Sequence, residues 1–447
     1  MTQQSNRLSG LAPAGDLATF IPEPQTVQET GLDFGLLLDL CLKTVYYAGR
    51  PSARQIGERM GLSFNVVEEL LGFLRKQEYF EIVGTSGLGE TEYQYALTAK
   101  GVAKTHEVLE ASQYAGAAPV PFDQYIEVVK RQTVRAITVT QDVFEQALSR
   151  LVLSQPTRDQ LGTAIASGAS LFVYGEPGNG KSTIAEAIGN MLLDPILVPY
   201  AIEVHGQIVR VYDPRVHLPA IHAGPDSSSS NGILASTRRA ATARDQRWAR
   251  SRRPLITVGG ELTLSELELR YSPTAKFYVA PIQVRANGGV LVVDDFGRQL
   301  MRPEELLNRW MIPMERQVDH LTFHTGETVE IPFDMLLVFA TNLSPSRLGD
   351  EAFYRRIRHK VKIPDPTEEE FLDILRRAAE QSDVPLRQDG CDYLLNNYYR
   401  DGSRAMRGVH PRDLLALISD IARYRNQAPE FSPEWIDAAC GSYFVTD

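Results

Sequence analysis

Residues 175–182 read Gly-Glu-Pro-Gly-Asn-Gly-Lys-Ser, a spacing suited to binding phosphate groups. Three glycines let the backbone turn and point its N–H groups at an anion, at the start of the helix expected from residue 183. Lys181 then reaches the β- and γ-phosphates of a nucleotide, and the Ser182 hydroxyl coordinates Mg²⁺. An ordinary glycine-rich turn is the alternative, which the match at every specified position disfavours. The predicted nucleotide-binding residues are Gly175, Glu176, Pro177, Gly178, Asn179, Gly180, Lys181, Ser182 and Thr183.

Two carboxylates follow a second apolar run, at Asp294 and Asp295. The preceding run, 290–293, is typical of a buried parallel strand, which delivers the residues after it to the C-terminal edge of a sheet. We expect Asp294 to hold Mg²⁺ through water, and Asp295 to orient or deprotonate an attacking water. The alternative is a buried strand followed by acids that face solvent.

Polar residues in the second half of the chain complete a set of candidates. The apolar run 335–341 predicts a buried strand that ends at Asn342, whose side chain is placed to hold the lytic water. Arg355 and Arg356 follow, ahead of a strand-like segment at 361–364. Arg412 lies where a helix opens in a C-terminal segment that we expect to be all-helical.

In this order the motifs resemble those of the AAA+ ATPases, over residues 136–447. The resemblance implies these roles: Walker A at 175–182, Walker B at 290–295, sensor 1 at Asn342, an arginine-finger segment at Arg355 and Arg356, and sensor 2 at Arg412. It also implies that Arg356 or Arg355 reaches the γ-phosphate bound in a neighbouring subunit, while Arg412 senses it from the helical lid of the same chain. The alternative for these arginines is a surface salt bridge.

The chain departs from the family pattern at Asp295, where most members have Glu. Asp is one methylene shorter, so we expect slow hydrolysis. The segments Gly288-Gly289, 306–310 and 325–327 resemble the branch that contains MoxR-type chaperones and bacterial enhancer-binding activators.

Residues 31–112 resemble a winged helix-turn-helix domain. The patterns predict helices at 32–48, 52–60, 63–77 and 98–111, with strands at 80–83 and 93–97. The helix at the DNA-reading position carries two glutamates and no arginine before Arg75, and this segment has eight Lys or Arg against eleven Asp or Glu. Phosphate binding needs the opposite sign, so protein docking is favoured over DNA reading.

The expected fold class is α/β, a three-layer αβα P-loop NTPase core of the AAA+ type with a C-terminal helical lid and an N-terminal winged-helix (α+β) domain. The expected domains are a flexible tail at 1–30, the winged helix at 31–112, a linker at 113–135 that includes a helix from 122 to 132, the core at 136–364, and the lid at 365–447.

Bulk properties narrow the class of protein. A net charge of −10 argues against a surface built throughout to bind nucleic acid. The three cysteines have no metal-binding spacing, and no signal sequence or membrane span is evident, so we expect a cytoplasmic protein.

Three other features are weaker candidates for functional sites. Residues 238–253 hold seven arginines and one acid. Such a run suits a surface that binds an acidic partner or nucleic acid, and the alternative is a solvated helix or a subunit-contact face. His320 and His324 lie in a predicted strand, which disfavours a metal site. The aromatic residues Tyr271, Phe277 and Tyr278 suit either a ring pore or, more simply, hairpin packing.

These observations favour an ATP- and Mg²⁺-dependent AAA+ ATPase. The resemblance implies a homo-oligomeric ring, with six subunits expected, that remodels an unidentified protein client recruited through the winged helix. One alternative is a DNA-binding regulator whose ATPase ring controls assembly, and another is a nucleotide switch that hydrolyses ATP slowly.

Overall fold

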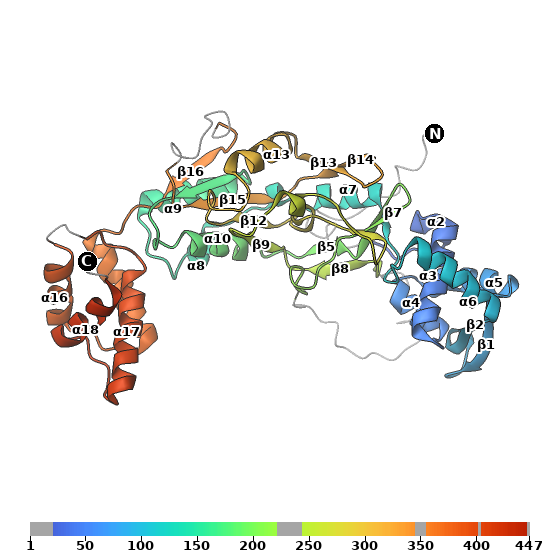
Figure 1. The fold of residues 1–447 in the computed structure, drawn as a ribbon, viewed down its shortest axis with the longest axis horizontal. Helices are drawn as coiled ribbons and strands as arrows, with labels where there is room; N and C mark the ends of the chain where they lie inside the picture. Colours follow the sequence, from blue (N-terminus) through green and yellow to red (C-terminus); the bar gives the residue numbers. More distant parts are fainter. Residues whose placement is uncertain (1–20, 221–243, 345–354, 401–403, 445–447) are drawn as a thin grey trace.

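The computed structural model describes residues 21–220, 244–344, 355–400 and 404–444. An N-terminal unit of helices and a β-hairpin and a C-terminal bundle of helices lie at opposite ends of a central part built on sheets (Figure 1). Within these residues, no helix combines the length and the apolar character that crossing a membrane requires.

A five-stranded parallel sheet organises the central part, in the order β16-β4-β15-β12-β9. Its strands are β4 (Leu171–Tyr174), β9 (Leu255–Val258), β12 (Val290–Val293), β15 (Leu336–Thr341) and β16 (His359–Lys362). The strands predicted at 171–174, 290–293 and 335–341 are confirmed, and the one predicted at 361–364 begins two residues earlier. Continuous apolar runs form such strands because helices bury both faces of the sheet.

Alternate residues of each strand enter two different cores. Phe172 and Phe339 pack on one face with α12 and α13, whereas Val173 and Val338 pack on the other with α8, α9 and α10. Successive strand side chains point to opposite faces, so the result is a three-layer αβα arrangement. The helices are α8 (Gln141–Ala147), α9 (Gln155–Ala166), α10 (Lys181–Asn190), α12 (Ile282–Arg285) and α13 (Pro303–Arg316).

A mixed sheet that we did not predict lies between the parallel sheet and the N-terminal unit, in the order β10-β11-β7-β6-β3. It shares a core with α7 (Phe122–Arg131) and with two antiparallel pairs. Its strands are β3 (Val120–Pro121), β6 (Ala201–Val204), β7 (Gln207–Arg210), β10 (Arg270–Ser272) and β11 (Phe277–Val279), and the pairs are β5 (Ile196–Pro199) with β8 (Trp248–Ser251) and β13 (Val318–Thr322) with β14 (Thr328–Pro332).

The segment expected as a linker, residues 113–135, is part of the packed structure. Val120 pairs with β6, and Tyr114, Ala118 and Val120 are buried. The small residues that suggested a flexible linker instead allow close packing between the N-terminal unit and the mixed sheet. The predicted helix within this segment is confirmed as α7.

The N-terminal unit contains the elements predicted for residues 31–112. Three helices, an antiparallel pair of strands and a closing helix contribute to one core. They are α3 (Phe34–Ala48), α4 (Ala53–Met60), α5 (Phe64–Lys76), β1 (Phe80–Thr85), β2 (Tyr93–Leu97) and α6 (Ala99–Ala111). Thr98 caps α6, as its position before that helix predicts, and Ser52 caps α4. Ser63, the expected cap of α5, makes no capping hydrogen bond with its side chain, and its hydroxyl donates instead to the carbonyl of Pro24 at 2.7 Å.

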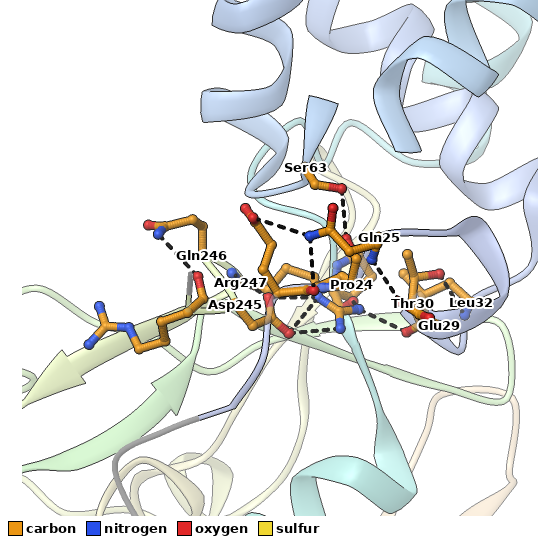
Figure 2. A network of polar contacts seen from close by, with 12 residues as sticks. Pro24, Gln25, Glu29, Thr30, Leu32, Ser63, Asp245, Gln246 and Arg247 are labelled. Atoms are coloured by element: carbon orange, nitrogen blue, oxygen red, sulfur yellow. Dashed lines mark hydrogen bonds and ion pairs between the residues drawn. The ribbon is translucent and has the colours of Figure 1, made fainter. Parts of the chain in front are cut away.

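Residues 21–30 are structured, so the flexible tail predicted for 1–30 is wrong for this portion, while 1–20 lie outside the described residues. They form the short helix α2 (Val27–Thr30), in which Val27 and Thr30 are buried. Figure 2 shows the polar network that holds them: Arg247 donates to the Thr30 carbonyl at 2.9 Å and to the carboxylate of Asp245. Local composition does not reveal this network, because Arg247 and Thr30 are 217 positions apart.

The C-terminal bundle, as we call the helices after residue 366, has a core of its own. Its helices are α15 (Glu368–Ser382), α16 (Gln388–Tyr398), α17 (His410–Arg425) and α18 (Pro433–Tyr443). The prediction of an all-helical segment is confirmed for the part of the bundle that the structure describes.

Candidate nucleotide-binding site

The predicted phosphate-binding loop connects β4 to α10. Gly175, Gly178 and Gly180 all have positive φ angles, a conformation that glycine adopts without steric cost. At Gly178 an added Cβ would also lie 2.6 Å from Val409 Cγ1 of the C-terminal bundle. The loop therefore requires glycine for its own turn and for the approach of the bundle.

Lys181 begins α10 and is buried. Its Nζ donates to the carbonyls of Gly175 at 3.0 Å and Glu176 at 2.8 Å. Burial lowers the pKa of Lys181, while the nearby carboxylates of Asp294 and Asp295 act to raise it. The ammonium thus lies beneath the loop, close to where the N-terminus of α10 favours negative charge.

Ser182 and Asp294 form a pair with the chemistry of a magnesium site. The Ser182 hydroxyl donates to Asp294 Oδ2 at 2.6 Å, from the first turn of α10 to the end of β12. Hydroxyl and carboxylate oxygens are ligands that Mg²⁺ takes, together with waters and phosphate oxygens. These residues therefore fit the ion.

Asp295 and Asn342 meet because β12 and β15 are neighbours in the sheet. The Asn342 amide donates from Nδ2 to Asp295 Oδ1 at 3.0 Å. Asp295 has a φ of 47°, which is uncommon for a residue with a Cβ. The Asn342 Oδ1 is buried and has no hydrogen-bond partner among the described residues. The pair thus holds two polar side chains together at the C-terminal edge of the sheet.

A cavity of about 740 Å³ connects these residues with the C-terminal bundle. Most of the candidate residues line it: Pro177, Gly178, Asn179, Gly180, Lys181, Ser182, Thr183, Asp294, Asp295, Asn342 and Arg412. Gly175, Glu176, Arg355 and Arg356 do not. The central part therefore has the fold of a P-loop nucleotide-binding domain, with the phosphate loop, both carboxylates and Asn342 at one edge of its parallel sheet.

The candidate arginines differ in position. Arg412 lies in the first turn of α17, with its side chain 75% exposed and 3.2 Å from Asp413. Arg356 lies 3.6 Å from Glu315 and, like Arg355, is exposed. The preceding residues 350–354 of that motif lie outside the described residues. Of these arginines only Arg412 reaches the cavity of its own chain.

Sequence reasoning missed the apolar half of the cavity and an arginine, Arg407, that contacts the phosphate loop outside the cavity. Leu151, Val152 and Leu153 precede α9, and Ile374 and Ala378 lie on α15. No motif marks these residues, because the two segments are brought together only when the bundle folds against the loop. The same holds for Arg407, which contacts the phosphate loop although only Arg412 was singled out in that region.

The arginine-rich run has a structural role where it is described. Residues 238–243 lie outside the described part, and 248–251 form strand β8. Arg247 is buried against Asp245, and Arg253 donates to the carbonyls of Gln132 at 2.9 Å and Gly288. Both side chains are buried, so they belong neither to a solvated helix nor to a surface that faces a partner.

The aromatic and histidine candidates pack in the mixed sheet region. Tyr271 and Tyr278 are cross-strand neighbours in the hairpin β10-β11, and Tyr278 is fully buried. Hairpin packing is thus confirmed, and a pore-lining role is wrong for Tyr278. His324 contacts the Tyr278 hydroxyl and His320 lies in β13; within the described residues, no cluster of three or more His, Cys, Asp or Glu is placed to hold a metal ion.

Comparisons with known proteins give a family match for the bundle alone. Residues 367–442 match a family described as a domain of unknown function, DUF8689. No curated protein matches the sequence.

Among solved structures, NtrX from Brucella abortus in complex with ADP is similar at 15% identity and a TM-score of 0.40, over 78% of this chain and 68% of that one. The RuvB Holliday junction branch migration motor of Thermotoga maritima is similar at 15% identity and a TM-score of 0.37, over 65% of this chain and 70% of that one. The fold assignment rests on the sheet and the phosphate loop of this chain.

Proposed function

We propose that the protein is an AAA+ ATPase that binds and hydrolyses ATP with Mg²⁺ in the cavity between the parallel sheet and the C-terminal bundle. The observation that carries the proposal is the convergence of three elements on one cavity: Lys181 under the loop, the Ser182–Asp294 pair, and the Asp295–Asn342 pair. Each has a separate part in phosphoryl transfer to water, and all three lie at the C-terminal edge of one sheet.

The loop N–H groups and Lys181 bind the β- and γ-phosphates. Mg²⁺, held by Ser182 and through water by Asp294, neutralises charge on the phosphates when it is bound. Asp295 orients the attacking water or accepts its proton, and Asn342 holds the Asp295 carboxylate in place. Leu151, Leu153 and Ile374 offer an apolar surface for the base of the nucleotide.

The C-terminal bundle acts as a lid in this proposal, because Arg412 and α15 complete the cavity from the far side. Arg355 and Arg356 are exposed and lie outside the cavity of their own chain, which supports a role toward a neighbouring subunit. We therefore propose a homo-oligomeric ring, with six subunits expected.

The N-terminal unit is proposed to be a winged helix that recruits a protein client. In helix-turn-helix proteins the first residues of the second helix read the bases. Here the corresponding end of α5 contacts the chain itself: Ser63 donates to Pro24, and Asn65 Nδ2 donates to Gln25 Oε1 at 3.1 Å. This contact, shown in part in Figure 2, supports protein docking over DNA reading.

A slow nucleotide switch is the second candidate. It is supported by the short side chain of Asp295, whose carboxylate already accepts the Asn342 amide. The two functions differ only in the rate of turnover.

Replacing Asp295 with Asn separates binding from hydrolysis. We expect Asp295→Asn to bind ATP with Mg²⁺ like the wild type and to release phosphate about 10² to 10⁴ times more slowly, because the amide keeps the shape and loses the base. Calorimetric titration and steady-state phosphate release measure the two quantities, with Asp392→Asn on the exposed side of α16 as the matched control. Wild-type turnover in Asp295→Asn would contradict the role of Asp295. A wild-type protein that binds ATP without turnover would favour the switch.

A mixing experiment tests the ring. Arg356→Ala subunits keep a complete cavity and Lys181→Ala subunits keep the arginine, so mixed rings regain active sites. Such arginines contribute on the order of 10³ to 10⁵ in rate, so the mixture should hydrolyse ATP faster than either variant alone. A fully active Arg356→Ala protein would move the role to Arg355, and a protein that stays monomeric with ATP would contradict the ring.

A further inference from the structure

Arg407 lies in the turn before α17 and connects three separate segments of the chain. Its Nη2 is 3.1 Å from Glu176 Oε2 of the phosphate loop, and its Nη1 pairs with Asp365 Oδ1, between β16 and α15. The Arg407 side chain is 21% exposed, whereas those of Glu176 and Asp365 are 60% and 36% exposed, so the ion pairs are shielded from water mainly on the arginine side. Charge-assisted, two-armed contacts of arginine fix orientation as well as distance.

Asn179 extends this network through both ends of its amide. Its Nδ2 donates to Asp365 Oδ1 at 2.7 Å, and its Oδ1 accepts from the backbone N–H of Gly408 at 3.0 Å. Two residues of the phosphate loop, Glu176 and Asn179, are therefore tied to the turn that precedes α17 and to the segment that joins the sheet to the bundle.

The turn before α17 packs so closely on the phosphate loop that the contact depends on the shape of the loop. Val409 Cγ1 lies 2.6 Å from the position that a Cβ at Gly178 would take. The backbone oxygen of Glu176 also accepts from Lys181 Nζ at 2.8 Å. One residue thus joins the buried lysine, through its backbone, to Arg407, through its side chain.

Arg407 differs from Arg412 in what it contacts. Arg412 lines the cavity, whereas Arg407 does not and is paired with two carboxylates. Its effect on a bound nucleotide is thus exerted through the loop and the bundle.

We propose that Arg407 is a positioning residue that latches the C-terminal bundle onto the phosphate loop, so that the latch sets how long a nucleotide stays in the cavity. The inference rests on the proposed ATP-binding function. Without the latch the bundle leaves the loop more often, and one wall of the cavity, with Ile374, Ala378 and Arg412, leaves with it. Dissociation becomes faster, while association, which takes place with the bundle open, changes little.

Stopped-flow measurements with the full chain and a fluorescent N-methylanthraniloyl-ATP test this directly. We expect Arg407→Ala to raise the dissociation rate constant about tenfold, which corresponds to about 1.4 kcal/mol, and to leave the association rate constant within about twofold. Arg400→Ala is the matched control, because Arg400 pairs with Glu368 within the bundle and does not contact the loop. It should dissociate at the wild-type rate.

A double-mutant cycle separates a latch from a general loss of structure. Glu176→Gln should raise the dissociation rate constant, and Arg407→Ala combined with Glu176→Gln should be less than additive, because both remove the same contact. If the nucleotide dissociates from Arg407→Ala at the wild-type rate, or if the effects of the two substitutions are strictly additive, the latch is overturned while the ATPase proposal stays intact. Failure of the folded wild-type protein to bind the probe would overturn both.

Discussion

A single buried arginine, Arg247, joins the N-terminal unit to the central part. Its side chain is 1% exposed and that of Asp245 is fully buried. The guanidinium donates to both carboxylate oxygens and to the carbonyl of Thr30 (Figure 2). Removing two charges from water is costly, and the cost is offset only while each group keeps its partners.

Removing one member of this ion pair should therefore strongly lower the stability of the protein. Arg247→Met leaves the Asp245 carboxylate buried without its cation, and we expect the free energy of unfolding to fall by about 3 to 5 kcal/mol. Denaturant titration measures this, with the exposed Arg252→Ala as a control expected within about 0.5 kcal/mol of the wild type. The double variant Asp245→Asn/Arg247→Met should recover part of the loss. A change below about 1 kcal/mol in Arg247→Met would show that the pair does not hold the unit.

At the scale of elements, helix α17 carries one group that lines the cavity and one that is sensitive to pH. Arg412 reaches the cavity from its first turn, and His410 is buried at its start, where Nδ1 lies 3.0 Å from the Tyr399 hydroxyl. Burial, together with the charges of Arg407 and Arg404, lowers the pKa of His410 to about 4. The folded bundle thus requires a neutral imidazole.

This requirement makes stability depend on pH in a defined direction. Below its ordinary pKa of about 6.5 the unfolded chain binds a proton at His410, whereas the folded chain does not until about pH 4. Stability is therefore lost as the pH falls between these values, by about 2 kcal/mol from pH 7 to pH 5. We expect His410→Gln to lose less between the two pH values, in denaturant titrations, while the exposed His106→Gln behaves like the wild type. An equal loss in His410→Gln would place the sensitive group elsewhere.

Elements defined by local signals were predictable from the sequence, and those defined by distant pairing were not. Capping residues such as Thr98 and continuous apolar runs such as 290–293 act within a few positions. The helices of the N-terminal unit and four strands of the parallel sheet could therefore be predicted, whereas its fifth strand, β9, was not. The mixed sheet pairs β3 with β6, about 80 positions apart, through strands of two and four residues. Strands this short have no readable period.

At the scale of the whole molecule, one part of the nucleotide-binding cavity could be predicted from the sequence and another part could not. The phosphate loop and the residues after β12 and β15 could be predicted, because the order of parallel strands brings their C-terminal ends together. The apolar lining at 151–153 and on α15, and the bonds from Arg407 to Glu176 and Asp365, exist only once the bundle lies against the loop. The sequence alone therefore predicts the phosphate half of the cavity and, of the half that encloses it, only the helical bundle and Arg412.

The most direct test of the account is ATP binding by the full chain with and without the Lys181 ammonium. In isothermal titration with Mg²⁺ and ATP, we expect the wild type and the exposed control Lys130→Ala to bind, and Lys181→Ala to show no measurable binding, because the backbone donors of the loop do not replace a cation at the β- and γ-phosphates. An affinity of Lys181→Ala within about twofold of the wild type, in a protein that remains folded, would contradict the assignment of this cavity as the nucleotide site.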